Sequence, residues 1–157
     1  MSTAPTEYEH LLSEAVNQAK AKAPRATDDL FRFSSRAAEA VDSVTGGAAA
    51  LELVPMNSDG SAAPTYQLQL RKVGSEAPPS DLGVYSLSPA GYPVRHWYSR
   101  TSWEFNQDRS DGTYHNVTEM EGHFRSLVSD PDSRLVFFVS FFQQTVSVST
   151  SSDAEPR

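Results

Sequence analysis

The chain has 157 residues, a formal net charge of −7 and no cysteine. This length fits one domain of ordinary size. The absence of cysteine excludes a disulfide scaffold, a thiolate nucleophile, a zinc finger and an iron–sulfur cluster. The acidic balance disfavours general nucleic-acid binding, which needs a basic surface to displace counterions from phosphates.

The ends of the chain and its longest apolar stretch indicate where in the cell we expect the protein. No basic region followed by an apolar one opens the chain, and Leu135–Phe142 is far shorter than the ~20 residues of a membrane span. We therefore expect a cytoplasmic protein that does not enter membranes. We further expect a flexible N-terminus over residues 1–5, one domain over 6–149 and a disordered tail over 150–157.

Two amphipathic helices are predicted at the start of the chain. Thr6 and Glu9 form a capping box, and apolar residues then recur at helical spacing until Pro24, which we expect to end the helix. Thr27 is the predicted cap of a second helix, which would stop at Gly46 because glycine adopts the left-handed cap conformation readily.

The apolar period changes to two after residue 48, which predicts strands. We expect a first strand around Leu51 and Leu53, followed by an antiparallel meander joined by short turns, among them Asn57–Ser61. The further strands are expected over residues 66–71, 82–87, 92–99 and 103–107.

A third helix is predicted to begin at Asn116 or Thr118 and to end at Asp130. The last element, Leu135–Phe142, is apolar at nearly every position. Its β-branched and aromatic composition favours a strand buried on both faces, with a short buried helix as the alternative; residues 145–149 would extend the strand. The predicted fold class is α+β.

The segment from residue 92 to residue 103 has the densest aromatic and basic composition in the chain. Strand alternation would direct His96 and Tyr98 to one face, and Arg95 and Trp97 to the other. Tryptophan, tyrosine and arginine are enriched at the energetic centres of protein interfaces, although sheet aromatics also build cores. The candidate partner surface comprises Tyr92, Arg95, His96, Trp97, Tyr98, Arg100 and Trp103.

Catalytic and metal-binding patterns are weak. His115, Glu119 and His123 are spaced by four and would share a helix face as metal ligands, but no fourth ligand has an obvious spacing. Serines near His96 offer a hydrolase only in principle, because no nucleophile-elbow motif occurs. The sequence predicts no catalytic residue and no cofactor.

The favoured function is therefore a small protein-binding or accessory module that acts through the aromatic-arginine surface. Its partner would be another protein, with homodimerisation through an exposed sheet edge as one form. Two alternatives stay open: a metal-dependent or histidine-based hydrolase, and a ligand-binding domain with an apolar pocket lined by Phe124, Phe138 and Tyr66. In outline, the hairpin at residues 91–94 followed by a helix resembles small bacterial proteins, which implies no particular activity.

Overall fold

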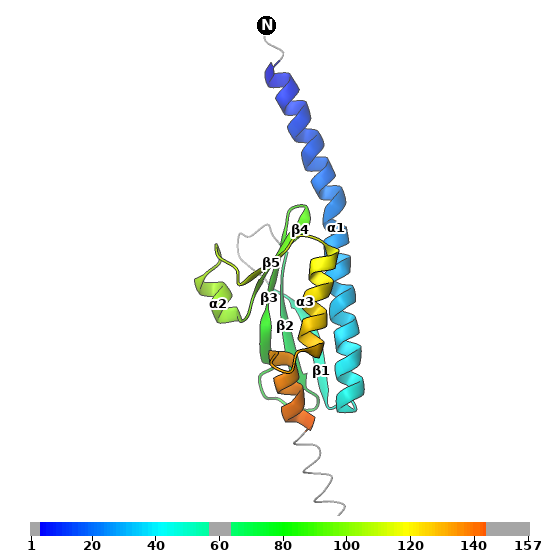
Figure 1. Ribbon diagram of the computed structural model, residues 1–157. Helices are drawn as coiled ribbons and strands as arrows, with labels where there is room; N and C mark the ends of the chain where they lie inside the picture. Colours follow the sequence, from blue (N-terminus) through cyan, green and yellow to red (C-terminus); the bar gives the residue numbers. More distant parts are fainter. Residues whose placement is uncertain (1–3, 57–63, 144–157) are drawn as a thin grey trace, which may run out of the picture.

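A computed structural model describes residues 4–56 and 64–143. It shows an α+β fold with a long helix, a five-stranded antiparallel sheet and further helices (Figure 1). The elements run in the order α1 (Ala4–Thr45), β1 (Ala49–Pro55), β2 (Thr65–Lys72), β3 (Ser80–Ser88), β4 (Gly91–Trp97), α2 (Arg100–Phe105), β5 (Gly112–Tyr114) and α3 (Val117–Ser129), followed by a helix over residues 134–143. The predicted turn at Asn57–Ser61, the strand extension over 145–149 and the tail over 150–157 lie outside the described residues.

One helix, α1, replaces the two that the sequence predicts, and it runs through Pro24. Proline removes the N–H that would bond the carbonyl of Lys20, which normally ends or bends a helix. Both residues are exposed, so water can bond the freed carbonyl, and no packing against the sheet prevents the helix from bending away from the proline ring. The helix changes direction between its blue and cyan parts in Figure 1 and continues to Thr45.

The sheet is an antiparallel meander, as predicted, with strands in the order β1-β2-β3-β4-β5, but its fifth strand lies over residues 112–114 instead of 103–107. β1 and β5 form its two edges. Helices α1 and α3 cover one face, whereas α2 lies on the opposite side of the sheet (Figure 1).

The predicted strand over residues 103–107 is wrong, because α2 occupies this part of the chain. Ser99 caps that helix: its side chain accepts a hydrogen bond from the backbone N–H of Ser102. A short polar side chain three residues before its donor is a helix start signal, and it prevails over the weak apolar alternation that follows.

The C-terminal segment forms a helix over residues 134–143, so the favoured strand is wrong and the alternative of a short helix is confirmed. Ser133 caps it by accepting a hydrogen bond from the N–H of Val136 at 3.1 Å. Leu135 is buried and Phe138 half-buried, whereas Phe137 is 66% exposed. Inward-facing positions therefore recur with helical period, which composition alone did not reveal.

The core lies between the sheet and its covering helices. Residues 26–45 of α1 direct Ala26, Leu30, Phe33, Ala37 and Val41 onto the strands, and α3 adds Met120 and Phe124. As predicted, α3 is capped by Asn116, whose side-chain oxygen accepts from the N–H of Glu119 at 3.0 Å. None of the described helices combines the length and the apolar character that crossing a bilayer requires.

Candidate protein-binding surface

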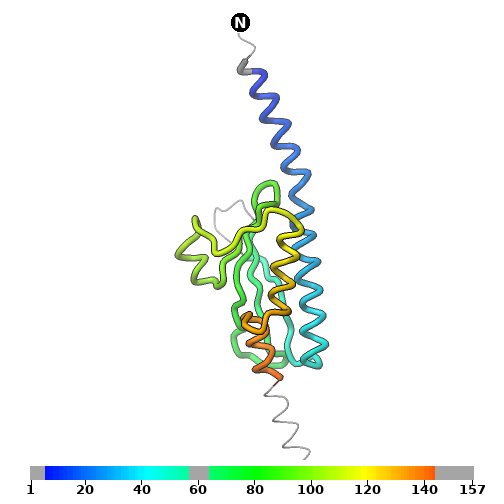
Figure 2. Tube along the Cα trace, in the orientation of Figure 1, coloured from blue at the N-terminus to red at the C-terminus, as the bar shows by residue number. Residues whose placement is uncertain are grey.

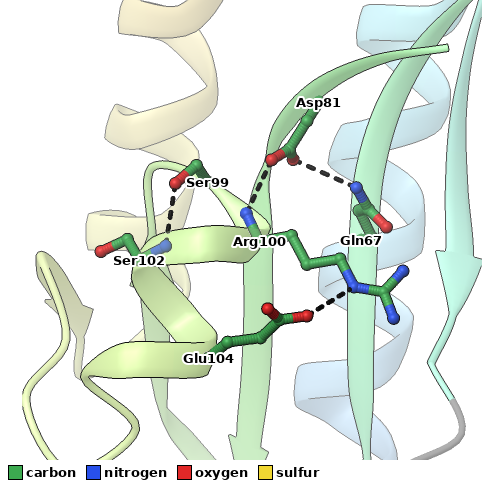
Figure 3. Close-up of polar contacts among 6 residues, drawn as sticks. All are labelled: Gln67, Asp81, Ser99, Arg100, Ser102 and Glu104. Atoms are coloured by element: carbon green, nitrogen blue, oxygen red, sulfur yellow. Dashed lines mark hydrogen bonds and ion pairs between the residues drawn. The ribbon is translucent and has the colours of Figure 1, made fainter. Parts of the chain in front are cut away.

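The short helix α2 is attached to the sheet by hydrogen bonds to its first residues. Asp81 on β3 accepts from the backbone N–H of Arg100 at 2.6 Å and from the side-chain amide of Gln67 at 3.2 Å (Figure 3). Asp111 accepts from the backbone N–H of Tyr98 at 3.0 Å and from the hydroxyl of Ser102 at 3.1 Å. Two carboxylates thus hold the start of α2 against the ends of β3 and β4.

Trp97 lies beneath this helix and is only 1% exposed. Its indole N–H donates to the carbonyl of Asn106 at 2.8 Å, directly after the last residue of α2. The guanidinium of Arg95 lies 4.8 Å from the centre of the indole ring. Trp97 is therefore a buried support that positions both Arg95 and the end of α2.

Exposed aromatic area lies on α2 itself. Phe105 is 81% exposed, and Trp103 is half-buried. Arg100 is exposed and forms an ion pair with Glu104 at 3.3 Å, drawn in Figure 3. Arg95 forms no ion pair with any described residue. We call Arg95, Arg100, Trp103 and Phe105 the α2 surface.

The seven residues of the predicted partner surface do not lie on one surface in the structure. Arg95, Arg100 and Trp103 belong to the α2 surface, but His96 and Trp97 are buried and cannot touch a partner. Tyr92 faces α1, where its hydroxyl donates to Asp29 at 2.7 Å. Tyr98 is exposed, but its ring contacts that of His96 edge-on, on the face of the sheet away from Arg95.

Phe105 was not among the predicted surface residues, although it is the most exposed large apolar side chain of the described chain. It was missed because the candidate surface was chosen from the aromatic and basic segment over residues 92–103, which ends two residues before Phe105. The Ser99 cap is the sequence signal for a helix in this segment. The helix that begins there is short and cannot cover its own apolar side chains, so Phe105 stays exposed.

A second group of polar aromatic side chains lies between the sheet and α3, and we call it the His–Tyr cluster: Tyr85, His96, Tyr114 and His123. The two ring nitrogens of His123 contact the hydroxyls of Tyr85 at 2.5 Å and Tyr114 at 2.7 Å. The Tyr114 hydroxyl also lies 3.4 Å from Nδ1 of His96. The rings of Tyr85 and His96 stack with centroids 4.5 Å apart.

Burial keeps this cluster uncharged at neutral pH. Desolvation lowers the pKa of His123 from 6.5 to about 4 and holds the pKa of His96 well below its usual value. Burial likewise raises the pKa of Tyr85 and of Tyr114. In neutral His123 one ring nitrogen donates and the other accepts, which matches two hydroxyl partners. The cluster is thus a satisfied polar part of the core, apart from one atom.

That atom is Nε2 of His96, which is buried without a hydrogen-bond partner among the described residues. It faces Gly83, where an added Cβ would lie 2.7 Å from Nε2 and 2.5 Å from the carbonyl oxygen of Trp97. Gly83 also has a φ of 129°, which disfavours any side chain. A glycine is therefore required for His96 to pack against β3.

The three weak metal-ligand candidates do not converge. Glu119 accepts hydrogen bonds from the backbone N–H of His115 at 2.9 Å and contacts Nδ1 of the same residue at 3.1 Å. Both nitrogens of His123 contact tyrosine hydroxyls instead. Across residues 4–56 and 64–143, no three histidine, aspartate or glutamate side chains are grouped to hold a metal ion.

The side chains considered for a histidine-based hydrolase do not contact one another as a triad. Ser102 contacts Asp111, but the ring of His96 contacts Tyr114 and reaches neither of them. An open cavity of about 260 Å³ lies between α1 and α3, lined in part by Phe124, Arg36 and Arg125. Phe138 and Tyr66 are not in its lining.

Comparison of the chain with known protein families, with curated proteins and with solved structures gives no match.

Proposed function

We propose that this chain is a small cytoplasmic protein-binding module that contacts its partner through the α2 surface. The observation that carries the proposal is the 81% exposure of Phe105, on a helix that hydrogen bonds hold against the sheet. A partner that covers a ring of this size removes its apolar area from water, which is favourable by about 1.5–3 kcal/mol. Aromatic and arginine side chains are also the types that contribute most to binding energy.

Arg95 supports a partner that carries a carboxylate. Its guanidinium stacks on Trp97 and forms no ion pair with an acidic residue in the described part of the chain. A stacked guanidinium keeps its N–H groups in a fixed plane, where they can bond a carboxylate at two points. The partner segment is accordingly one with an apolar side chain, to cover Phe105, beside an acidic side chain, to pair with Arg95.

Photo-crosslinking in cells of the native host tests this proposal. A benzophenone amino acid replaces Phe105, and the control chain carries it at Val73, which is 49% exposed in the loop after β2. We expect a discrete adduct with another protein from position 105 and not from position 73. Arg95→Glu should then weaken the adduct by about tenfold or more, because it places like charges opposite each other.

The same substitution made elsewhere is the matched control. Arg36→Glu changes the charge equally but lies on α1, and it should leave the adduct intact. An adduct that is equally strong from positions 73 and 105, or one that Arg95→Glu does not weaken, would contradict the proposal.

A further inference from the structure

The N-terminal half of α1 has an apolar stripe that nothing in the described chain covers. The helix continues well beyond the sheet, as Figure 2 shows, and we call residues 4–25 the arm. Tyr8 is 70% exposed and Leu12 is 67% exposed. Leu12, Ala19, Ala26 and Phe33 follow one another at intervals of seven, so the stripe of the arm continues the buried stripe of the packed half.

The stripe is asymmetric in side-chain size. Its largest residues, Tyr8, Leu11 and Leu12, lie toward the start of the helix, Val16 lies near the middle of the arm, and Ala15, Ala19 and Ala23 lie from there toward the sheet. Two such helices side by side in the same direction would place large residues against large ones and leave gaps between the alanines. In the antiparallel direction, each large side chain of one helix meets the small side chains of the other.

The charges of the arm have the same asymmetry. Glu7 and Glu9 lie near its start, and Lys20 and Lys22 lie near its end. At about 3.6 residues per turn, Glu9 and Lys20 lie on one flank of the apolar stripe, whereas Glu7 lies on the other flank and Lys22 lies at the edge of the stripe on that same side, between Leu11 and Ala15. In an antiparallel pair each flank faces the same flank of its partner, so a second copy offers an opposite charge to each of these four residues.

One alignment of the two antiparallel helices brings the opposite charges on both sides of the stripe level with each other. When the two-fold axis passes between Glu14 and Ala15, Glu9 is level with Lys20 of the second copy, and Glu7 is level with Lys22. The same alignment brings Ala4, where the helix begins, level with Arg25 of the second copy. Ala26, the next residue, is fully buried against the sheet domain. The length of helix that the second copy would cover therefore reaches to where α1 begins to pack on the sheet domain, with Ala23, beside Gly91 at the start of β4, at that boundary.

We propose that two copies of this chain associate through their arms as an antiparallel helix pair in this alignment. A parallel pair would place Glu7 and Glu9 beside their own counterparts, and Lys20 and Lys22 likewise, which is repulsive. The antiparallel pair sets the two sheet domains at opposite ends of an arm that is about 30 Å long at 1.5 Å per residue. This inference does not depend on the proposed function, because the arm and the α2 surface are separate.

Charge-swap variants of the full-length chain, followed by sedimentation across a dilution series, test the pairing. We expect a reversible dimer for the natural sequence. Glu7→Lys with Glu9→Lys should weaken self-association by about tenfold or more, and so should Lys20→Glu with Lys22→Glu. The chain that carries all four changes should dimerise again. Glu39→Lys with Glu76→Lys alters net charge equally but outside the arm, and it should leave the dimer unchanged.

Because the natural chain has no cysteine, single engineered cysteines report the direction of the pair. Ala15→Cys lies beside the two-fold axis and should form an intermolecular disulfide readily. Tyr8→Cys should not, because its counterpart lies at the far end of the second arm. Disulfides from both variants would indicate a parallel pair and would overturn the proposal.

Three further outcomes would also overturn it. They are a monomer at every concentration, a dimer that neither charge swap weakens, and a four-change chain that stays monomeric. Each variant is checked for a folded sheet domain by its near-ultraviolet circular dichroism, so a loss of dimer cannot be mistaken for a loss of fold.

Discussion

The two halves of α1 have the same apolar period but opposite surroundings. Leu30, in the packed half, is fully buried beneath the sheet, whereas Leu12, in the arm, is 67% exposed. Both halves are helical. The difference is that the packed half is stabilised by burial of its stripe, whereas the arm relies on helix propensity unless a partner covers it.

This contrast shows what an amphipathic pattern can predict. The pattern identifies a face that must be covered, but it does not identify what covers it. In residues 26–45 the covering element is the sheet that follows in the chain, and for the arm we infer that it is a second copy.

The largest expected effect comes from truncating one leucine in each half. Leu30→Ala should lower the free energy of unfolding by about 2–5 kcal/mol, because it leaves a cavity in the core. Leu12→Ala should change it little in dilute protein, since that side chain is exposed in the monomer. Urea unfolding followed by tryptophan fluorescence measures both. Equal losses from the two variants would show that the arm packs on the sheet domain.

Acid should unfold the packed region through the His–Tyr cluster. Below pH 6.5 the unfolded chain binds a proton at His123, which the folded protein does not bind until the pH approaches about 4. Lowering the pH across this interval therefore favours the unfolded state, by about 3 kcal/mol for a pKa difference of this size. Above pH 6.5 both states are neutral at this residue, and the effect vanishes.

The measurement is the free energy of unfolding between pH 7 and pH 4 for the natural chain and for His123→Gln, with urea as the denaturant. The variant keeps a polar side chain but cannot titrate, so its stability should fall less steeply over this interval. His96 remains in both proteins and contributes the same way, as its pKa is also lowered by burial. Identical slopes would show that His123 is protonated in the folded protein.

A smaller effect is expected where the two halves of α1 meet. Pro24→Ala restores an N–H that can bond the carbonyl of Lys20, and proline in a helix interior is less favourable than alanine by about 3 kcal/mol. We expect slower amide hydrogen exchange in the arm, because local opening becomes more costly, and little change in the packed half. Faster exchange in the arm would mean that the proline bend itself is stabilising.

Sequence reasoning predicted those parts of the fold that local interactions determine. The meander follows from strand alternation and turn residues, and the start of α3 follows from Asn116, whose side chain caps the helix as expected. Pro24 was misjudged because its effect depends on exposure, which only the tertiary structure sets. The segment over 134–143 was misjudged because an apolar run is compatible with a strand or a helix until its neighbours are known.

The candidate site was predicted only in part, because the exposure of a side chain also depends on the tertiary structure. The sequence located the aromatic and arginine residues, but it could not tell Trp97, which is buried, from Phe105, which is exposed. That distinction depends on where the chain turns after β4. The turn is fixed by Asp81, which is distant in sequence from the N–H of Arg100 that it binds.

The smallest predicted effect concerns one hydroxyl that joins the packed half of α1 to β4. The Tyr92 hydroxyl donates to Asp29 at 2.7 Å, and Asp29 also pairs with Arg32 at 3.0 Å. Tyr92→Phe removes this one hydrogen bond and preserves the ring, so we expect a loss of about 1 kcal/mol in the free energy of unfolding.

Tyr8→Phe is the matched control in the arm, where the ring is 70% exposed, and it should have no measurable effect on the monomer. If both substitutions were neutral in urea unfolding, the Asp29 carboxylate would be as well solvated without Tyr92 as with it. The contact between α1 and β4 would then be purely apolar, and burial alone would separate the packed half from the arm.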